Sequence, residues 1–398
     1  MSPFDFSAPG RIIFGWGRIA ELGAIVQPIG PRAFIVWGSR TIAGSTVGKG
    51  IVASLETAGL EAVAFQAPTG EPDVATIDAL AERLHEKQPT RDDLIIAIGG
   101  GSGLDAGKAL AGIALDPDRA SIKEFLEGVG SGRRINWPVL PVVAVPTTAG
   151  TGSEATFNAV ISSRDPPFKK SFRDQRLMPK VALVDPQLAC SAPKQITAWS
   201  GMDALTQLIE SLLSRKATWT TSLLAMGGLL AVPDSLRRVN ADPNDRYARE
   251  MLAVAALRSG LALANGGLGL AHGVAAGLGA LKGTPHGLAC AVMLPTAVAL
   301  NAYAHREDPA VTWTNMQWMM RQPREEPVIN DQKKAHAWVL AEIRSLIDEL
   351  GIPSRLGELG VTNDDIPELV RLSQGSSMSG NPKSLTQDEL RSLLEYLL

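Results

Sequence analysis

Cysteine, histidine and surplus charge are all scarce in this sequence. The two cysteines, Cys190 and Cys290, lie far apart and form no Cys-x-x-Cys pair. We therefore expect neither a disulfide framework nor a thiolate metal site, and we expect a reducing, cytoplasmic setting. The net charge is only -3, which gives no basic surplus for binding nucleic acid or an anionic membrane. Because there are only five histidines, two that lie close together carry more weight than usual.

Patterns for secretion and membrane insertion are also missing. Residues Met1–Phe6 contain neither a basic region nor an apolar region, so we expect no signal peptide. The most apolar stretch, Leu261–Leu300, is interrupted by glycines, two histidines, a lysine and two prolines. It predicts a buried, glycine-rich helical core rather than a membrane span. A chain of 398 residues with 45% hydrophobic residues is long for one core and favours two domains.

The two halves of the chain have different patterns. The first half alternates short β-branched runs with amphipathic stretches, which predicts a mostly parallel sheet covered by helices. The expected strands are Arg11–Phe14, Ala33–Trp37, Ala62–Gln66, Leu94–Ile98, Val139–Val145 and Val181–Val184. After Asp185-Pro186 we expect only helices, apart from a segment without regular secondary structure over Asp308–Asp331. These helices are Ala204–Leu213, Leu223–Leu236, Arg246–Ala264, Gly287–Ala304, Ala335–Leu350 and Thr386–Leu397. We predict an α/β domain over residues 1–189 and an all-helical domain over residues 190–398.

A glycine-rich turn follows the expected strand Leu94–Ile98. The turn, Gly99–Gly103, leads into a helical pattern. Free backbone N–H groups at such a helix start attract phosphate, and glycines let the main chain approach an anion closely. An ordinary strand-to-helix turn with Ser102 as the N-cap is the alternative.

A second polar segment follows another expected strand. Pro146–Glu154 comes directly after Val139–Val145 and contains more hydroxyls and glycines than a turn requires. On one parallel sheet, both turns would border a crevice at the carboxyl edge of the strands, where nucleotides bind. A hydrogen-bonded loop rich in serine and threonine is the alternative.

Possible metal ligands gather in the second half of the chain. His272 and His286 lie close together among small residues, and Asp203 and Gln207 stand at i and i+4 on one expected helix face. One carboxylate and two imidazoles are the ligand set of a non-haem Fe(II) site with open positions, and Zn²⁺ is also compatible. Each histidine taken alone is more commonly a hydrogen-bonded core or cap residue.

Taken in order, these segments resemble the iron-containing (group III) alcohol dehydrogenase family over nearly the whole chain. The resemblance begins at Pro9–Gly15 and runs through the glycine turn with Asp105 and Lys108, then Pro146–Glu154, Asp185-Pro186, Gly201–Glu210 and the two histidines. It implies an N-terminal dinucleotide-binding α/β domain, an all-α C-terminal domain in a dehydroquinate synthase-like arrangement, a metal between them, and a homodimer.

The resemblance also implies which residues bind the cofactor. These residues are Gly38, Ser39, Gly100, Gly101, Ser102, Asp105, Thr147, Thr148, Thr151 and Lys169. At the end of the second expected strand, Gly38-Ser39-Arg40 stands where NAD-preferring members carry an acidic residue. Glycine, serine and arginine leave space and positive charge for a 2′-phosphate, so we favour NADP(H) over NAD(H).

For the metal, the resemblance implies Asp203, His272 and His286 as ligands, with Fe(II) favoured over zinc. Gln207 stands where the fourth ligand is usually histidine. Its amide oxygen is a poor ligand for soft metals, so it would bind weakly, orient a water molecule, or leave a three-ligand site. Ala276 stands where many members have a further histidine near the nicotinamide. Proton transfer would then use water, a ribose hydroxyl or another side chain.

These features predict an enzyme that transfers a hydride between a nicotinamide cofactor and a small alcohol, aldehyde or ketone, with a metal stabilising charge on the substrate oxygen. One alternative is metal-independent reduction, as in maleylacetate reductases, which typically carry more histidines than the segment His272–Ala276. A second is a lyase or cyclase of the dehydroquinate synthase type, which needs more basic residues than the helical half supplies. A third is a nucleotide-binding protein that has lost its metal site because Gln207 and Ala276 stand where other members have histidine.

Overall fold

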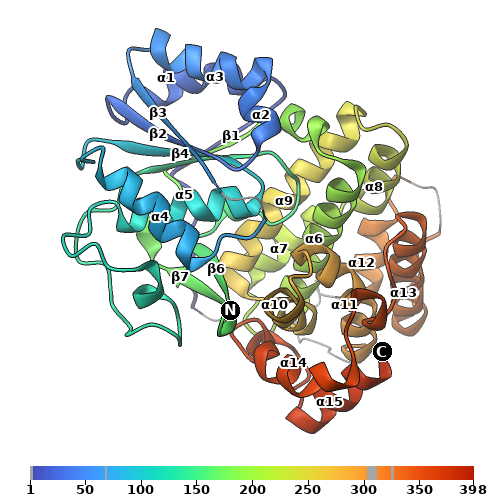
Figure 1. The fold of residues 1–398 in the computed structure, drawn as a ribbon. Coiled ribbons are helices and arrows are strands. Elements are labelled where there is room, and N and C mark those ends of the chain that lie inside the picture. Colours follow the sequence, from blue (N-terminus) through green and yellow to red (C-terminus); the bar gives the residue numbers. More distant parts are fainter. Residues whose placement is uncertain (1–2, 68–69, 303–311, 324–326) are drawn as a thin grey trace.

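The chain folds into a helix-covered parallel sheet followed by a helical part, which confirms the predicted fold class. The computed structural model describes residues 3–67, 70–302, 312–323 and 327–398. Figure 1 shows the sheet and its helices, coloured blue to green, on one side of the molecule and the helical part, coloured lime green to red, on the other.

Six strands form the sheet, in the order β1-β8-β5-β4-β2-β3, and all neighbouring strands are parallel. The strands are β1 (Arg11–Phe14), β2 (Arg32–Trp37), β3 (Glu61–Gln66), β4 (Leu94–Gly99), β5 (Val142–Pro146) and β8 (Val181–Val184). β4, β5 and β8 are buried along their whole length because apolar clusters cover both faces of the sheet. Burial on both faces explains why these strands appear in the sequence as continuous apolar runs.

Helices from the N-terminal half cover the two faces of the sheet. One face packs against α1 (Leu22–Val26), α2 (Arg40–Gly44) and α3 (Thr46–Thr57), and the other against α4 (Val74–His85) and α5 (Gly101–Ile113). α5 begins directly after β4, so its N-terminus lies at the carboxyl edge of the sheet.

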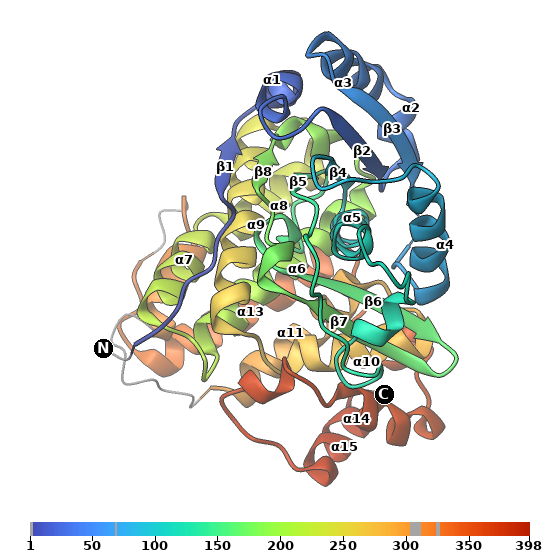
Figure 2. The ribbon, with the colours of Figure 1, turned by 90° about the vertical axis from the view of Figure 1, so that its left-hand side faces the viewer.

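A two-stranded antiparallel hairpin lies outside the sheet and was not predicted. It consists of β6 (Asn158–Arg164) and β7 (Pro167–Arg173). It packs between α5 and α10 (Leu270–Lys282), and Figure 2 shows it beside α10. The many charged and hydroxyl side chains of this segment hide the alternation that normally marks a strand.

The helical part contains the largest apolar cluster of the molecule. Its helices are α6 (Lys194–Leu213), α7 (Trp219–Gly228), α8 (Val232–Ala241), α9 (Arg246–Gly266), α10 (Leu270–Lys282), α11 (His286–Leu300), α12 (Trp313–Met320), α13 (Gln332–Glu349), α14 (Ile366–Ser373) and α15 (Gln387–Tyr396). Among the described residues, no strand follows β8. The predicted division after residue 189 falls in a short 3-10 helix, Pro186–Ser191, which connects the two parts.

Several helices differ from the prediction. The single helix expected over Leu223–Leu236 is two helices, because Ala231 adopts a left-handed conformation with φ 59° between α7 and α8. α12 lies inside the stretch Asp308–Asp331, which was predicted to be irregular. Residues 308–311 and 324–326 of that stretch, and the predicted helix end at Ala304, lie outside the described residues.

Within the described ranges, no single helix is long and apolar enough to cross a membrane. α9 and α10 pass that length and composition test only as a pair, and they are bent by 98° relative to each other.

The two parts of the chain touch backbone to backbone at a pair of glycines. A Cβ atom on Gly152 would lie 2.5 Å from the Cα atom of Gly260 in α9, and a Cβ atom on Gly260 would lie 2.1 Å from the carbonyl oxygen of Gly152. Neither position has room for a side chain, so glycine at both positions lets the loop after β5 lie directly on α9.

Candidate metal and cofactor site

A cavity of about 500 Å³ lies between the carboxyl edge of the sheet and the helical part. One wall comes from the start of α5, the segment after β5, and the β6–β7 hairpin. The opposite wall comes from α6, the ends of α9 and α11 that face the cavity, α10, and residues 372–377. Both segments that the sequence indicated as turns at the strand ends therefore border one space with three of the predicted metal ligands, Gln207, His272 and His286.

Four side chains with metal-binding atoms converge in the helical part, beside the cavity. They are Asp203 from α6, His272 from α10, and His286 and Cys290 from α11, and their ligand atoms all lie within 4.8 Å of one another. Asp203 Oδ1 lies 3.2 Å from His272 Nε2 and 3.9 Å from His286 Nε2. A tetrahedral metal with bonds of about 2.0–2.3 Å separates its ligand atoms by about 3.3–3.8 Å, so this spacing suits a divalent cation.

Small residues allow these helices to approach each other. A Cβ atom on Gly287 would lie 2.3 Å from the carbonyl oxygen of Trp199 and 3.4 Å from the Cβ atom of Asp203. Glycine at this position therefore lets the start of α11 lie against α6, which brings His286 to Asp203.

Glu210, two turns after Asp203 on α6, holds His272 in place. Its Oε2 accepts hydrogen bonds from His272 Nδ1 at 2.7 Å and from the backbone N–H of Gly269 at 3.0 Å. Its Oε1 accepts a hydrogen bond from the backbone N–H of Ala271 at 2.6 Å. The carboxylate thus caps α10 and keeps the proton on Nδ1, which leaves Nε2 directed at Asp203.

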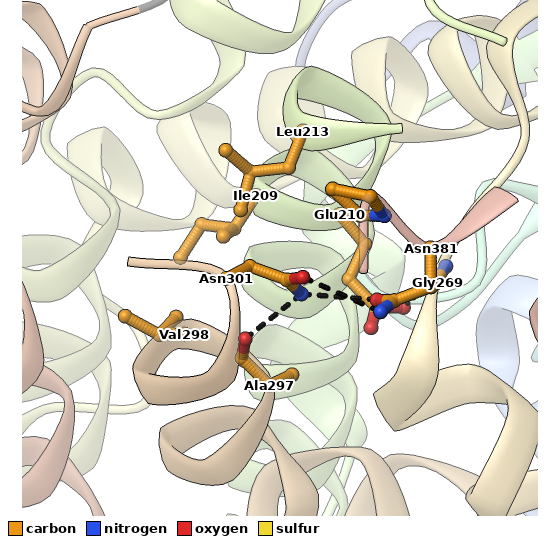
Figure 3. Close-up of a pocket in the computed structure, with 9 residues that line it drawn as sticks. Ile209, Glu210, Leu213, Gly269, Ala297, Val298, Asn301 and Asn381 are labelled. Carbon is orange, nitrogen blue, oxygen red and sulfur yellow. Dashed lines mark hydrogen bonds between the residues drawn. The ribbon is translucent and has the colours of Figure 1, made fainter. Parts of the chain in front are cut away.

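Two buried amides support the same helix start behind Glu210 (Figure 3). Asn381 Oδ1 accepts hydrogen bonds from the backbone N–H of Leu270 at 3.1 Å and from Asn301 Nδ2 at 3.0 Å. Asn301 Nδ2 also donates to the carbonyl oxygen of Ala297 at 3.0 Å. The N-terminus of α10 is therefore fixed from both sides, and His272 with it.

The charges in the cluster favour a cation. Burial opposes the ionisation of Asp203, yet His286 and His272 hold its pKa below the ordinary value of 3.8. Burial also opposes a charge on His272, but the carboxylates of Asp203 and Glu210 raise its pKa well above 6.5. The protonated imidazole of His272 thus supplies positive charge beside the buried carboxylate of Asp203, and a divalent cation would take over that role.

His286 borders the cavity as a neutral imidazole. Burial and the positive charge of Lys169 lower its pKa to about 4. Its Nδ1 is buried and has no hydrogen-bond partner among the described residues. A neutral imidazole beside an anionic carboxylate is a suitable ligand pair for a divalent cation.

Gln207 also borders the cavity, but both ends of its amide contact protein groups. Nε2 donates to the carbonyl oxygen of Thr151 at 3.2 Å, and Oε1 lies 2.7 Å from the hydroxyl of Ser259, which can donate to it. The predicted fourth ligand is therefore hydrogen bonded to protein atoms in this structure.

Cys290 belongs to this cluster, a position that the pattern of the two distant cysteines does not suggest. Its Sγ lies 3.8 Å from His286 Nε2, and the residue is fully buried. Burial raises the pKa of its thiol to about 12. The only sequence feature that pointed to Cys290 is its position one helical turn after His286. The corresponding feature for Glu210 is its position seven residues, or two helical turns, after Asp203.

The glycine turn has the geometry of an anion site. Gly100 is the N-cap residue of α5, and no side chain caps that helix, so Ser102 does not act as the N-cap. Gly101 and Ser102 line the cavity. A Cβ atom on Gly101 would lie 2.5 Å from Cγ2 of Thr151, which rules out a side chain there. The uncapped helix start suits a phosphate group.

The remaining predicted cofactor residues divide into two groups. Asp105, Thr151 and Lys169 line the same cavity as the glycine turn. The residues that do not belong to its lining are Gly38, Ser39, Gly100, Thr147 and Thr148. Lys169 forms an ion pair with Glu71, and Asp105 accepts a hydrogen bond from Ser153 Oγ at 2.6 Å.

Gly38 and Ser39 have structural roles that the sequence did not reveal. A Cβ atom on Gly38 would lie 2.7 Å from the Cα atom of Gly103, so the turns after β2 and β4 lie directly against each other. Ser39 is the N-cap of α2, and its side chain accepts a hydrogen bond from the backbone N–H of Ile42 at 3.3 Å.

Comparison with known proteins finds similarity along nearly the whole chain. The family model described as iron-containing alcohol dehydrogenase matches residues 9–186, and the model for the C-terminal part of the Fe-containing alcohol dehydrogenase family matches residues 197–398. The probable alcohol dehydrogenase EutG of Escherichia coli (strain K12) is 33% identical over 358 residues, which cover 90% of this chain and 85% of EutG. The NAD-dependent methanol dehydrogenase of Bacillus methanolicus is 29% identical over 401 residues, which cover 99% and 100% of the two chains. A crystal structure of 1,3-propanediol oxidoreductase matches with a TM-score of 0.89 at 28% identity and covers 100% of both chains.

Proposed function

The chain belongs to the iron-containing alcohol dehydrogenase family, and from this we propose that Asp203, His272 and His286 bind its metal beside the nicotinamide cofactor. The enzyme is a metal-dependent, nicotinamide-linked oxidoreductase that acts on small alcohols and aldehydes. The observation that carries the residue assignment is the convergence of these three side chains beside a cavity that His272 and His286 line together with Gly101 and Ser102.

Each residue of the cluster has a defined task in this proposal. A divalent cation held there would draw negative charge onto the substrate oxygen while the nicotinamide gives or takes the hydride. Asp203 supplies the buried negative charge, and His286 offers a neutral lone pair because its pKa lies at about 4. Glu210 keeps the proton of His272 on Nδ1, so that Nε2 faces the cluster. Ala276 also lines the cavity, and because alanine exchanges no proton, water, a ribose hydroxyl or another side chain would carry the proton here.

The cofactor would lie with its phosphates on the start of α5. The uncapped backbone N–H groups at Gly101 and Ser102 and the lack of space for a side chain at Gly101 support this assignment. We propose NADP(H) as the preferred cofactor, because Ser39 and the exposed Arg40 present no carboxylate to repel a 2′-phosphate.

Four further parts of the proposal rest on the sequence. The resemblance to the family supports Fe(II) as the resident metal and a homodimeric assembly. The scarcity of cysteine supports a cytoplasmic location, and the change of pattern after Asp185-Pro186 supports a division into domains after residue 189. The candidate ligand set is compatible with Fe(II) and with Zn²⁺.

Removal of a proposed ligand tests the assignment directly. We expect the variants His272→Ala and Asp203→Asn to lose bound metal and aldehyde reduction together, whereas His85→Gln on α4 keeps both. Metal is measured by elemental analysis of protein purified without chelators. Reduction of an aldehyde panel is followed with NADPH and with NADH on the same samples.

Two results would argue against the proposal. Full activity in a metal-free His272→Ala variant would refute the role of these ligands. Wild-type activity that survives exhaustive chelation would favour metal-independent reduction.

A further inference from the structure

We infer that Cys290 is the fourth protein ligand of the metal and takes the place of the histidine that Gln207 replaces. This inference rests on the proposed function, because it requires a metal bound by Asp203, His272 and His286. It adds a thiolate to that site, although the sequence predicts no thiolate ligand.

Helix geometry directs Cys290 into the cluster. His286 and Cys290 stand four residues apart on α11, so both side chains lie on the same face of the helix. Cys290 Sγ lies 3.8 Å from His286 Nε2 and within 4.8 Å of the ligand atoms of Asp203 and His272. Because neighbouring ligand atoms of one metal lie about 3.3–3.8 Å apart, coordination of Sγ requires only a small contraction of the cluster, and the substrate oxygen would be a fifth ligand.

The alternative ligand, Gln207, is less suited to the task. Coordination by its amide oxygen would compete with the hydroxyl of Ser259, which lies 2.7 Å from that oxygen. Its Nε2 is also engaged, with the carbonyl oxygen of Thr151. An amide oxygen is in addition a neutral, hard donor, whereas thiolate sulfur is anionic and soft.

Cys290 would also change the charge of the ligand shell. When the cation binds, the thiol of Cys290 would release its proton to water, and its sulfur electron pair would form the bond to the metal. The thiolate and the carboxylate of Asp203 would then balance the two charges of the cation within its own ligand shell, while Glu210 stays paired with His272 Nδ1.

This ligand set predicts a preference among metals. Thiolate favours thiophilic cations, so Fe(II), Co(II) and Zn²⁺ should bind far more tightly than Mg²⁺ or Mn²⁺. Replacement of the sulfur by oxygen in Cys290→Ser should reduce that preference. This preference is measured by metal binding and does not depend on the catalytic activity of the metal-loaded enzyme.

Cobalt spectroscopy tests the inference on the full-length protein. Wild-type protein is stripped of metal, loaded with Co(II), and examined for a thiolate-to-cobalt charge-transfer band in the near ultraviolet. We expect the band in the wild type and in the matched control Cys190→Ser. We expect Cys290→Ser to keep the visible cobalt bands, to lose the charge-transfer band, and to bind Co(II) at least about tenfold more weakly.

A measurement on the wild type covers the case in which Cys290→Ser fails to fold. X-ray absorption of the zinc-loaded wild type should then show one sulfur at about 2.3 Å from the metal. Bound cobalt without the charge-transfer band, or zinc without a sulfur neighbour, would overturn the inference and leave the proposed function intact. A wild-type protein that binds no metal at all would instead overturn the proposed function.

Discussion

Glu210 determines how firmly His272 is presented to the metal, and the variant Glu210→Gln tests this. Glutamine has the size of glutamate but replaces one acceptor oxygen by an NH₂ group. If the NH₂ group takes the place of Oε2, it meets the donors His272 Nδ1 and the N–H of Gly269. If it takes the place of Oε1, it meets the N–H of Ala271, which donates to that oxygen at 2.6 Å. In either orientation two donors face each other in a buried site.

The magnitude of the effect follows from these bonds. A hydrogen bond to a charged partner contributes about 1.5–3 kcal/mol, and a buried donor left without an acceptor costs about 1–3 kcal/mol. Loss of a group that orients a metal-binding histidine usually weakens metal affinity by about 10–100-fold, which corresponds to about 1.4–2.7 kcal/mol. We therefore expect the Kd for Co(II) or Zn²⁺ to rise by about 10–100-fold in Glu210→Gln.

The assay is a competition titration of stripped protein against a chromophoric chelator. Glu86→Gln, at an exposed position after α4, serves as the control and should keep the wild-type Kd. A Kd for Glu210→Gln equal to that of the control would show that Glu210 does not prepare His272 for the metal.

Two further predictions concern the cofactor and the pH dependence of stability. Ser39→Asp keeps the N-cap of α2 but places a carboxylate beside the proposed 2′-phosphate. The ratio of kcat/KM for NADPH to kcat/KM for NADH should therefore fall by at least about tenfold. The neutral variant Ser39→Asn should keep the wild-type ratio. An unchanged ratio in Ser39→Asp would contradict the proposed position of the phosphate. Burial raises the pKa of Glu154 from 4.5 to about 7. Its contribution to the free energy of unfolding is therefore fully present below about pH 4.5 and is lost as the pH rises through about 7. The loss amounts to at most about 3 kcal/mol. In urea unfolding at pH 8, Glu154→Gln should therefore have a higher free energy of unfolding than the wild type, and this difference should be much smaller at pH 5. An equal difference at both pH values would disprove the pKa shift.

The sheet could be predicted because its strands are apolar on both faces. β1 and β8 were predicted at their observed bounds, and β5 begins at Val142 rather than Val139, after Pro141. The sequence did not predict the β6–β7 hairpin, because contacts with α5 and α10 stabilise it rather than a regular alternation of apolar and polar residues. α10 was not delimited as a helix because its glycines, which serve close packing, reduce helix propensity.

The site could be predicted only in part, for a related reason. Asp203, His272 and His286 stand in motifs that the sequence displays, and the structure brings all three together. Glu210 and Cys290 stand on the same helices as Asp203 and His286, but only the packing of α6 against α10 and α11 brings them to the cluster. An isolated cysteine in a chain without Cys-x-x-Cys pairs gives no local indication of a metal site, so it was discounted.

The contact between Gly152 and Gly260 sets the spacing between two segments that border the cavity. A side chain at either position would push the segment after β5, which carries Thr151, away from α9. Since a displacement of about 1 Å can reduce a reaction rate by about a hundredfold, we expect substitution of either glycine to slow the reaction, although neither is a proposed ligand of the metal or the cofactor.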